Sequence, residues 1–158
     1  MANLIRAKDI MQTKLTTVSP DTNIYQAMDT FLNLKISGMP VVEAGGKLVG
    51  MLTQLHCINV VIQGSYETLP AANVSAYMDR DLVSTGPETD LLRLMEMFRQ
   101  ERLRRVPVVD EDGKLMGQIS RLDIIRKAKN LLEEVPQKER NGAFLFLSTV
   151  SSRESLRV

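Results

Sequence analysis

The sequence predicts a mixed α/β (α+β) fold built from two copies of one unit, each running strand, helix, strand, strand, helix. The main observation is an internal repeat: a constant shift of 67 residues aligns residues 11–58 with residues 78–125 without a gap. The strings "PVV" and "GKL" recur at matching places in both copies. Because about 50 residues make only a marginal independent fold, we expect the two copies to pack together with pseudo-twofold symmetry.

The first helix of each copy is predicted from a proline turn and an apolar stripe. The turns read "TVSPDT" and "STGPET", and proline is favoured at the first position of a helix. Apolar residues then recur at i, i+3, i+4 and i+7, which we interpret as a buried helix face. These residues are Ile24, Ala27, Met28 and Phe31 in the first copy and Leu91, Leu94, Met95 and Phe98 in the second.

Two strands and a second helix complete each copy. "MPVVE" and "VPVVD" are followed by a glycine turn and then by "KLVGMLT" and "KLMGQIS", a pattern typical of a β-hairpin. The second helix should begin near Thr53 or Ser120. The predicted divisions are 1–63 for the first motif, 64–73 for a linker, 74–130 for the second motif and 131–158 for a tail. That tail is interpreted either as a docking segment or as disordered.

Composition excludes several classes of partner. Lys and Arg number 20 and Asp and Glu 19, so a net charge of +1 gives no general attraction to nucleic acid or to a membrane surface. The single cysteine, Cys57, forms no disulfide within one chain and favours a reducing compartment. The N-terminus lacks a signal-peptide core, and no apolar run approaches the roughly 20 residues that span a bilayer. We expect a cytoplasmic protein with no nucleic-acid or membrane partner.

Six segments spread over both copies carry a family resemblance: "AKDIM" (7–11), "TVSPDTNIYQAM" (17–28), "SGMPVV" (37–42), "GKLVGMLT" (46–53), "VSAYM" (74–78) and "RRVPVVDEDGKLMGQISRLDII" (104–125). In this order and register the chain resembles a tandem pair of CBS (cystathionine beta-synthase) domains, the Bateman module, over residues 7–130. The resemblance implies two CBS motifs that act as a regulatory or sensory module rather than as an enzyme. Such modules often bind AMP, ADP, ATP or S-adenosylmethionine between the copies, and often form homodimers.

The segment "GQISRLD" (117–123) fits the ligand motif of that family, except that Gln118 fills a place that is usually apolar. An ionised Asp123 accepts both hydroxyl protons of a ribose diol, while the Ser120 hydroxyl and the free amides of the helix start suit phosphate or sugar. The spacing of Ser120 and Asp123 is also that of a helix capping box. The two roles can coexist.

The resemblance implies further site residues around the second motif. Arginine binds phosphate bidentately, so the pair before the strand suits phosphate, although it could instead be the solvated end of an amphipathic helix. A slot for adenine is expected from the backbone of the strand, and the segment before the first strand of the second copy is expected to line the same cleft. The residues in these roles are Arg104 and Arg105 for phosphate, Val106 and Pro107 with Ile119 opposite for adenine, and Arg80 for the cleft wall.

The first copy departs from the pattern. "GMLTQLH" keeps Thr53 but has His56 where the second copy has an acid, and Ser37 and Gly38 replace the arginine pair. A neutral histidine offers one acceptor nitrogen instead of two carboxylate oxygens, which should weaken recognition of a diol. We therefore predict a weaker first-motif site that is either vacant or specialised. Its candidate residues are Thr53, His56, Met39 and Pro40.

No catalytic or metal-binding constellation emerges. With one histidine, one cysteine, no phosphate-binding P-loop and no nucleophile elbow, we expect neither catalytic residues nor a metal site nor a required cofactor. The leading hypothesis is a sensory module that binds an adenosine-containing ligand mainly at the second motif and regulates an unknown protein in trans. The alternative is an oligomerisation or protein-interaction scaffold without a physiological small-molecule ligand.

Overall fold

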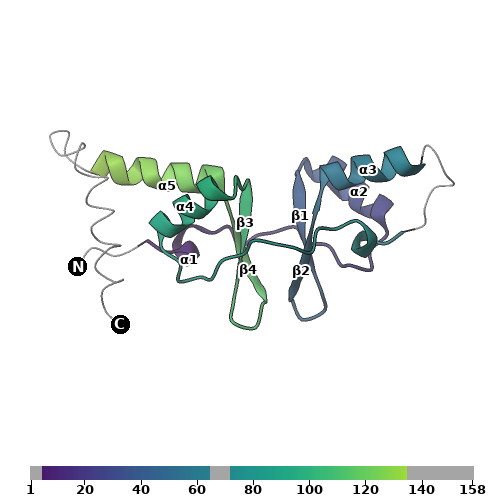
Figure 1. Cartoon of the computed structure of the whole chain (residues 1–158), viewed down its shortest axis with the longest axis horizontal. Coiled ribbons are helices and arrows are strands. Elements are labelled where there is room, and N and C mark those ends of the chain that lie inside the picture. The colour runs from purple at the N-terminus through teal and green to yellow at the C-terminus, as the bar shows by residue number, and fades with distance from the viewer. Residues whose placement is uncertain (1–4, 65–71, 135–158) are drawn as a thin grey trace. The chain divides into compact units, whose positions relative to one another are not determined.

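The computed structural model describes residues 5–64 and 72–134 of the chain (Figure 1). The predicted mixed fold with two repeats is confirmed. The elements are α1 (Ala7–Ile10), α2 (Ile24–Leu34), β1 (Gly38–Val42), β2 (Leu48–Thr53), α3 (Gln54–Gly64), the 3-10 helix η1 (Val74–Ala76), α4 (Leu91–Gln100), β3 (Arg105–Val109), β4 (Leu115–Ser120) and α5 (Arg121–Glu134). Most of the predicted linker and the segment 135–158 of the predicted tail lie outside the described residues, whereas residues 131–134 continue α5.

The first helix of each copy begins later than the proline turn predicts. α2 starts at Ile24 because the side chain of Asn23 accepts a hydrogen bond from the Tyr25 amide at 2.9 Å. In the second copy the Asp90 carboxylate accepts from the Arg93 amide at the start of α4, also at 2.9 Å. The assignment of Pro20 and its counterpart to the first helical position was therefore wrong, because an N-cap side chain satisfies the free amides further along the chain.

The first strand of each copy is reduced to a single parallel bridge. Val18 pairs with Val41: its amide donates to the Pro40 carbonyl at 3.0 Å, and its carbonyl accepts from the Val42 amide at 2.9 Å. The next parallel bond would need an amide hydrogen from Pro20, which proline lacks. Thr85 makes the equivalent bridge in the second copy, and a proline again follows two residues later.

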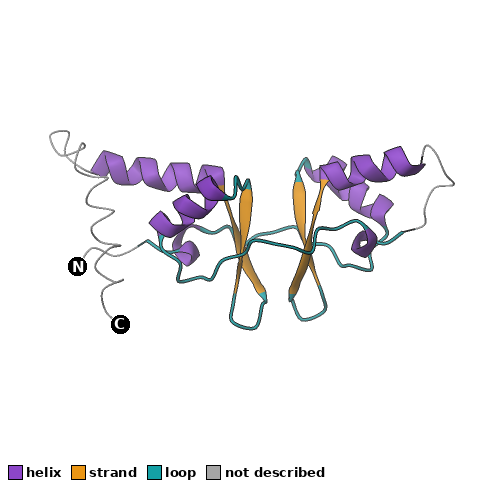
Figure 2. Cartoon of the chain, viewed as in Figure 1, coloured by secondary structure: helices purple, strands orange, loops and turns teal. Residues whose placement is uncertain are grey.

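The described residues form two compact units, each with its own core (Figure 2). The first unit contains residues 13–64, 72–84 and 109–117, and the second contains residues 5–12, 85–108 and 118–134. In the first unit two helices pack against one face of the hairpin β1–β2, and in the second unit α4 and α5 pack against β3 and the end of β4. The predicted stripes are buried there, with Ile24, Ala27 and Phe31 in the first core and Leu91, Leu94 and Phe98 in the second. The expected pseudo-twofold packing of the copies stays a prediction.

The segment that leads into each repeat packs in the unit built on the other repeat. Residues 5–12 belong to the second unit, where the Ala7 amide donates to the Thr89 carbonyl at 2.8 Å. Residues 73–79 belong to the first unit, where the Val74 amide donates to the Thr22 carbonyl at 2.8 Å. Each unit thus joins segments that are far apart in sequence, so its boundaries differ from those of the repeat.

Neither stretch of described chain, 5–64 or 72–134, contains a helix that is long and apolar enough to cross a membrane.

Candidate functional site

The start of α5 is organised by a reciprocal pair of hydrogen bonds between Ser120 and Asp123. Oδ2 of Asp123 accepts from the Ser120 amide at 2.8 Å and from its hydroxyl at 2.6 Å, and the Asp123 amide donates to Ser120 Oγ at 3.3 Å. This is the geometry of a capping box, as the spacing predicts. These bonds at the first turn of α5 hold the Asp123 carboxylate in place, and only 8% of the residue is exposed.

The second oxygen of Asp123 has a different environment. Oδ1 accepts from Nε2 of Gln12 and from Nη1 of Arg126, both at 3.2 Å. Gln12 reaches this place because its backbone pairs with that of Gln118 through two bonds of 2.9 and 3.0 Å. Sequence reasoning missed both donors. The i, i+3 spacing of Asp123 and Arg126 could have indicated one of them, but no local signal connects Gln12 to a residue 111 positions away.

The surroundings of Asp123 favour its ionised form. Burial by itself raises the pKa of this carboxyl group, but the hydrogen bonds from the Ser120 hydroxyl and amide and from Gln12, together with the charge of Arg126, outweigh it. The net effect is a pKa below the usual value for aspartate. The side chain is therefore an acceptor of hydrogen bonds at neutral pH.

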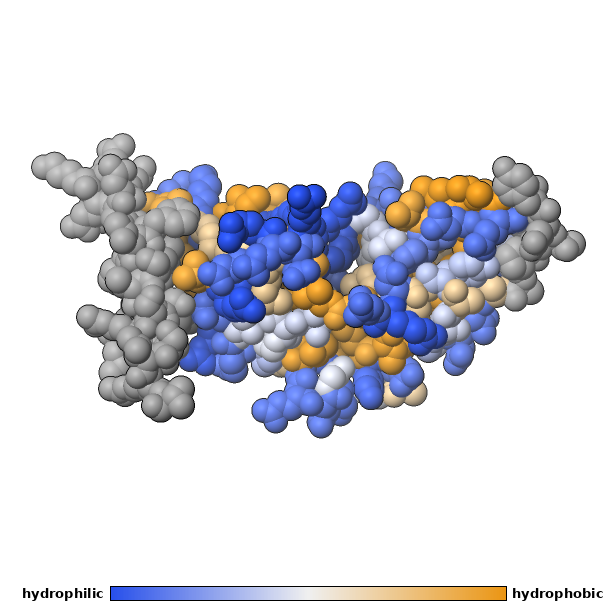
Figure 3. All heavy atoms as spheres, viewed as in Figure 1, coloured by the Kyte–Doolittle hydropathy of each residue, from blue (hydrophilic) through white to orange (hydrophobic). Residues whose placement is uncertain are grey.

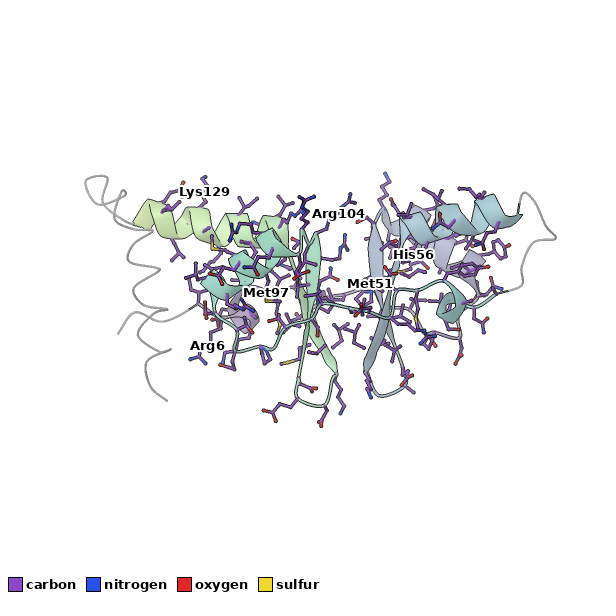
Figure 4. The ribbon with its side chains drawn as sticks, in the orientation of Figure 1. Arg6, Met51, His56, Met97, Arg104 and Lys129 are labelled. Atoms are coloured by element: carbon purple, nitrogen blue, oxygen red, sulfur yellow. The ribbon has the colours of Figure 1, made fainter. Side chains whose placement is uncertain are left out.

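Several arginines lie near this helix start. The Arg121 guanidinium donates to the carbonyls of Leu103 at 2.5 Å and Arg102 at 2.8 Å, and its amide donates to the Arg104 carbonyl at 3.2 Å. Arg104 itself is exposed beside the start of α5 (Figure 4). Arg105 is half-buried, and burial, followed by the charge of Arg104, lowers its pKa. The result is a local concentration of positive charge at the start of α5, where Arg126 contacts the Asp123 carboxylate, in a chain whose net charge is only +1.

The residues expected to line an adenine slot and its cleft have different surroundings. The side chains of Val106 and Ile119 are fully buried in the core of the second unit, so only their backbone is available to a ring. The Pro107 carbonyl accepts from the Thr85 amide at 3.0 Å. Arg80 belongs to the first unit, where Nη2 donates to the Ser75 carbonyl at 3.1 Å. The roles of these residues in ligand binding stay predictions.

At the start of α3, His56 takes the capping position that an acid fills in the second copy. Its Nδ1 accepts from the Thr53 amide at 3.1 Å, which is the bond that Asp123 makes to Ser120. Because Nδ1 is the acceptor, Nε2 carries the proton, and it lies 3.4 Å from Oδ2 of Asp79. The other two residues predicted for this site, Met39 and Pro40, have buried side chains.

The carboxylate of the first copy is relocated rather than lost. Asp79 corresponds to Gln12 under the 67-residue shift. Its backbone pairs with that of Met51 through two bonds of 2.9 and 3.0 Å, as the backbone of Gln12 pairs with that of Gln118 (Figure 4). In the second unit the leading segment supplies the donor and the helix start supplies the carboxylate. In the first unit these roles are reversed, and the side chain of Asp79 is 67% exposed.

Within residues 5–64 and 72–134, no three His, Cys, Asp or Glu side chains are grouped so that they could hold a metal ion.

Comparison with known families gives this architecture its class. The sequence model of the CBS domain matches residues 7–63 and again residues 74–130. The chain therefore belongs to the CBS-domain family and carries two CBS domains in tandem.

The relatives share this region. A CBS domain-containing protein of Bacillus subtilis, YhcV, is 34% identical over 118 residues, which cover 74% of this chain and 81% of that protein. Inosine-5'-monophosphate dehydrogenase of Aquifex aeolicus is 35% identical over 114 residues, which cover 72% of this chain but only 22% of the enzyme. CBSX2 of Arabidopsis thaliana, solved in complex with AMP, has a TM-score of 0.70 at 25% identity and covers 79% of this chain and 96% of that one.

Proposed function

We propose that this protein is a regulatory CBS-pair protein that binds an adenosine-containing ligand at the start of α5, in its second motif. The observation that carries the proposal is the buried Asp123 carboxylate, which is ionised and held by Ser120 beside a group of arginines. An ionised carboxylate recognises the two hydroxyls of a ribose, and guanidinium groups recognise phosphate. The carboxylate and the guanidinium groups together fit a nucleoside phosphate better than a nucleoside or a phosphate alone.

The two oxygens of Asp123 differ in how easily they can be given to a ligand. Oδ2 makes the shorter bonds, of 2.6 and 2.8 Å, and these belong to the helix cap. Oδ1 makes the longer bonds, of 3.2 Å, to Gln12 and Arg126, whose side chains lie on the surface. Longer hydrogen bonds from exposed side chains are weaker and cost less to exchange. A ribose hydroxyl therefore approaches Oδ1, and the cap keeps the carboxylate in position.

The comparison with CBSX2 supports the ligand class. That protein, at 25% identity over most of this chain, was solved with AMP. This chain spans about a fifth of the length of the inosine dehydrogenase that it resembles. The proposed role is regulatory, and the regulated partner, expected in trans, stays a prediction.

The test is calorimetric titration and thermal denaturation with AMP, ADP, ATP and S-adenosylmethionine. A ligand at 100 times its dissociation constant should stabilise the native protein by about 2.7 kcal/mol. Asp123→Asn should remove most of the ligand-induced shift, measured from the variant's own unliganded melting temperature. His56→Asn is the matched control at the equivalent place of the other repeat and should keep the shift. Equal losses in both variants, or no binding of any of the four compounds, would contradict the proposal.

A second candidate function, that of an oligomerisation module, is favoured by one further observation. The outer face of α3 exposes Leu55, Ile58 and Ile62 at 62%, 54% and 52%, and apolar atoms cover this surface in Figure 3. α5 repeats the pattern at the equivalent positions, with Leu122 and Ile125 exposed at 67% and 59%. Stripes of this kind on both repeats are typical of a helix face that a second copy of the chain covers. We propose that this face forms a homodimer.

Light scattering after gel filtration tests the dimer. The wild-type chain should have twice the mass of one chain, and Ile58→Glu should shift it towards the monomer. Leu32→Glu is the control, because Leu32 is 74% exposed but lies on α2. A monomeric wild type, or a dimer that survives Ile58→Glu together with Ile125→Glu, would contradict this assignment.

A further inference from the structure

Gln118 carries a buried acceptor that no described group satisfies. Within residues 5–64 and 72–134, Oε1 of Gln118 is the buried side-chain oxygen or nitrogen that lacks a hydrogen-bond partner. Leaving such an atom unpaired destabilises the folded protein, and the great majority of buried polar atoms in native proteins are paired. A donor that binds to Oε1 would therefore recover a sizeable free energy.

Gln118 lies on the same face of β4 as the serine that caps α5. It lies in β4, where Gly117 and Ile119 are buried. Since successive strand residues point to opposite faces, Gln118 shares its face with Ser120, two residues further on, which caps α5 and holds Asp123. The backbone of Gln118 also pairs with that of Gln12, whose side chain donates to the same carboxylate. The orphan acceptor is thus built into the strand that delivers the capping serine.

The fold itself does not require a polar residue at this place. The equivalent residue of the first repeat is Met51, which is 8% exposed and makes the same paired backbone bonds with its own partner segment. Glutamine at this place is therefore particular to the second copy of this chain. A residue that costs stability where an apolar one suffices suggests a role in binding.

We propose that Gln118 is a specificity-determining residue of the ligand site, and that its Oε1 accepts a hydrogen bond from the exocyclic amine of adenine. This inference rests on the proposed function. An amine at position 6 of the purine satisfies the orphan acceptor. A purine that carries only hydrogen at position 6 leaves this acceptor unpaired. Gln118 would then select adenosine phosphates over purine riboside phosphates, which lack the amine.

The test compares ligands on the intact wild-type chain first, so that it needs no substitution. AMP should bind at least about tenfold more tightly than purine riboside 5'-monophosphate, which lacks the amine. Equal affinities for AMP and purine riboside 5'-monophosphate would overturn the inference while leaving the proposed function intact. Failure of AMP to bind would overturn the inference, and the proposed function falls as well only if ADP, ATP and S-adenosylmethionine also fail to bind.

Gln118→Met then assigns the preference to this residue, since methionine is the natural residue at the equivalent place. The variant should bind AMP about tenfold more weakly, and about as weakly as it binds purine riboside 5'-monophosphate. Met51→Gln is the matched control and should retain the wild-type ratio of these two affinities. If Gln118→Met instead keeps both the affinity and the preference, Oε1 is satisfied by water rather than by the ligand, and the inference is wrong.

Discussion

In each repeat a single side chain caps the helix that follows the second strand of the hairpin. A carboxylate at Asp123 and an imidazole at His56 accept the same backbone bond, from Ser120 and from Thr53. The capping function thus survives the exchange of acid for histidine. What differs is the remaining acceptor capacity, since Asp123 has a second oxygen and His56 instead presents a protonated nitrogen to Asp79.

The lowered pKa of Asp123 makes part of the stability dependent on pH. Because its folded pKa lies below the unfolded value of about 3.9, its contribution is complete above that value and is lost as the pH falls through the folded pKa. We expect Asp123→Asn to be about 1–2 kcal/mol less stable than wild type at pH 7, a gap that narrows below pH 4. Urea unfolding at pH 7 and pH 3 measures it. A stability difference between the two proteins that is the same at both pH values would contradict the contribution assigned to the Asp123 charge.

The reversed pair in the first unit predicts non-additive substitutions. His56→Asp places two carboxylates against each other and should destabilise the protein, while Asp79→Gln alone removes only an exposed partner. The double variant recreates the arrangement of the second unit, with glutamine donating to an aspartate. We expect it to recover about 1 kcal/mol relative to the sum of the single effects. A double-mutant cycle by urea unfolding measures this coupling, and strict additivity would disprove the proposed equivalence.

Among the elements, β2 depends on a close approach that only glycine allows. A Cβ added to Gly50 would lie 2.5 Å from Sδ of Met78 and 3.0 Å from the Asp79 carbonyl oxygen. This approach lets the leading segment of the second repeat pair with β2 and carry Asp79 to His56.

Gly50→Ala should therefore destabilise the protein by about 1–3 kcal/mol, because backbone as well as side chain would have to move. The control is Gly86→Ala, where the added carbon meets nothing within 4 Å. That change should leave stability unchanged or raise it slightly, through the lower entropy of the unfolded chain. Thermal denaturation of both variants provides the measurement, and equal melting temperatures would contradict the account.

At the scale of the whole molecule, the N-terminal segment is part of the second core. Ala7 is fully buried among residues of α4, β3 and α5. Ala7→Asp should therefore unfold or loosen the second unit, whereas Lys8→Gln, at an exposed neighbouring position, should have little effect. Hydrogen exchange should report faster exchange in α4 and α5 of Ala7→Asp, with α2 and α3 less affected. Loss of protection in the first unit alone would disprove this assignment.

The fold could be predicted from sequence because duplication doubles every weak local signal. The apolar stripes of α2 and α4 and the glycine turns of both hairpins were recognisable in register. Contacts between distant segments were not, since nothing local indicates that Gln12 lies against Asp123 or that Asp79 lies against His56. The capping box followed from spacing, but the orphan acceptor of Gln118 depends on burial, which sequence does not give.

The exchange of leading segments also has a kinetic consequence. Every described segment of the first unit is synthesised by residue 117, whereas residues 5–12 bond to Thr89 and Gln118, which follow much later in the chain. This segment must therefore wait for the synthesis of residue 118 before it finds its place. Such non-local pairing slows folding, and it makes the second unit the later one to form during synthesis.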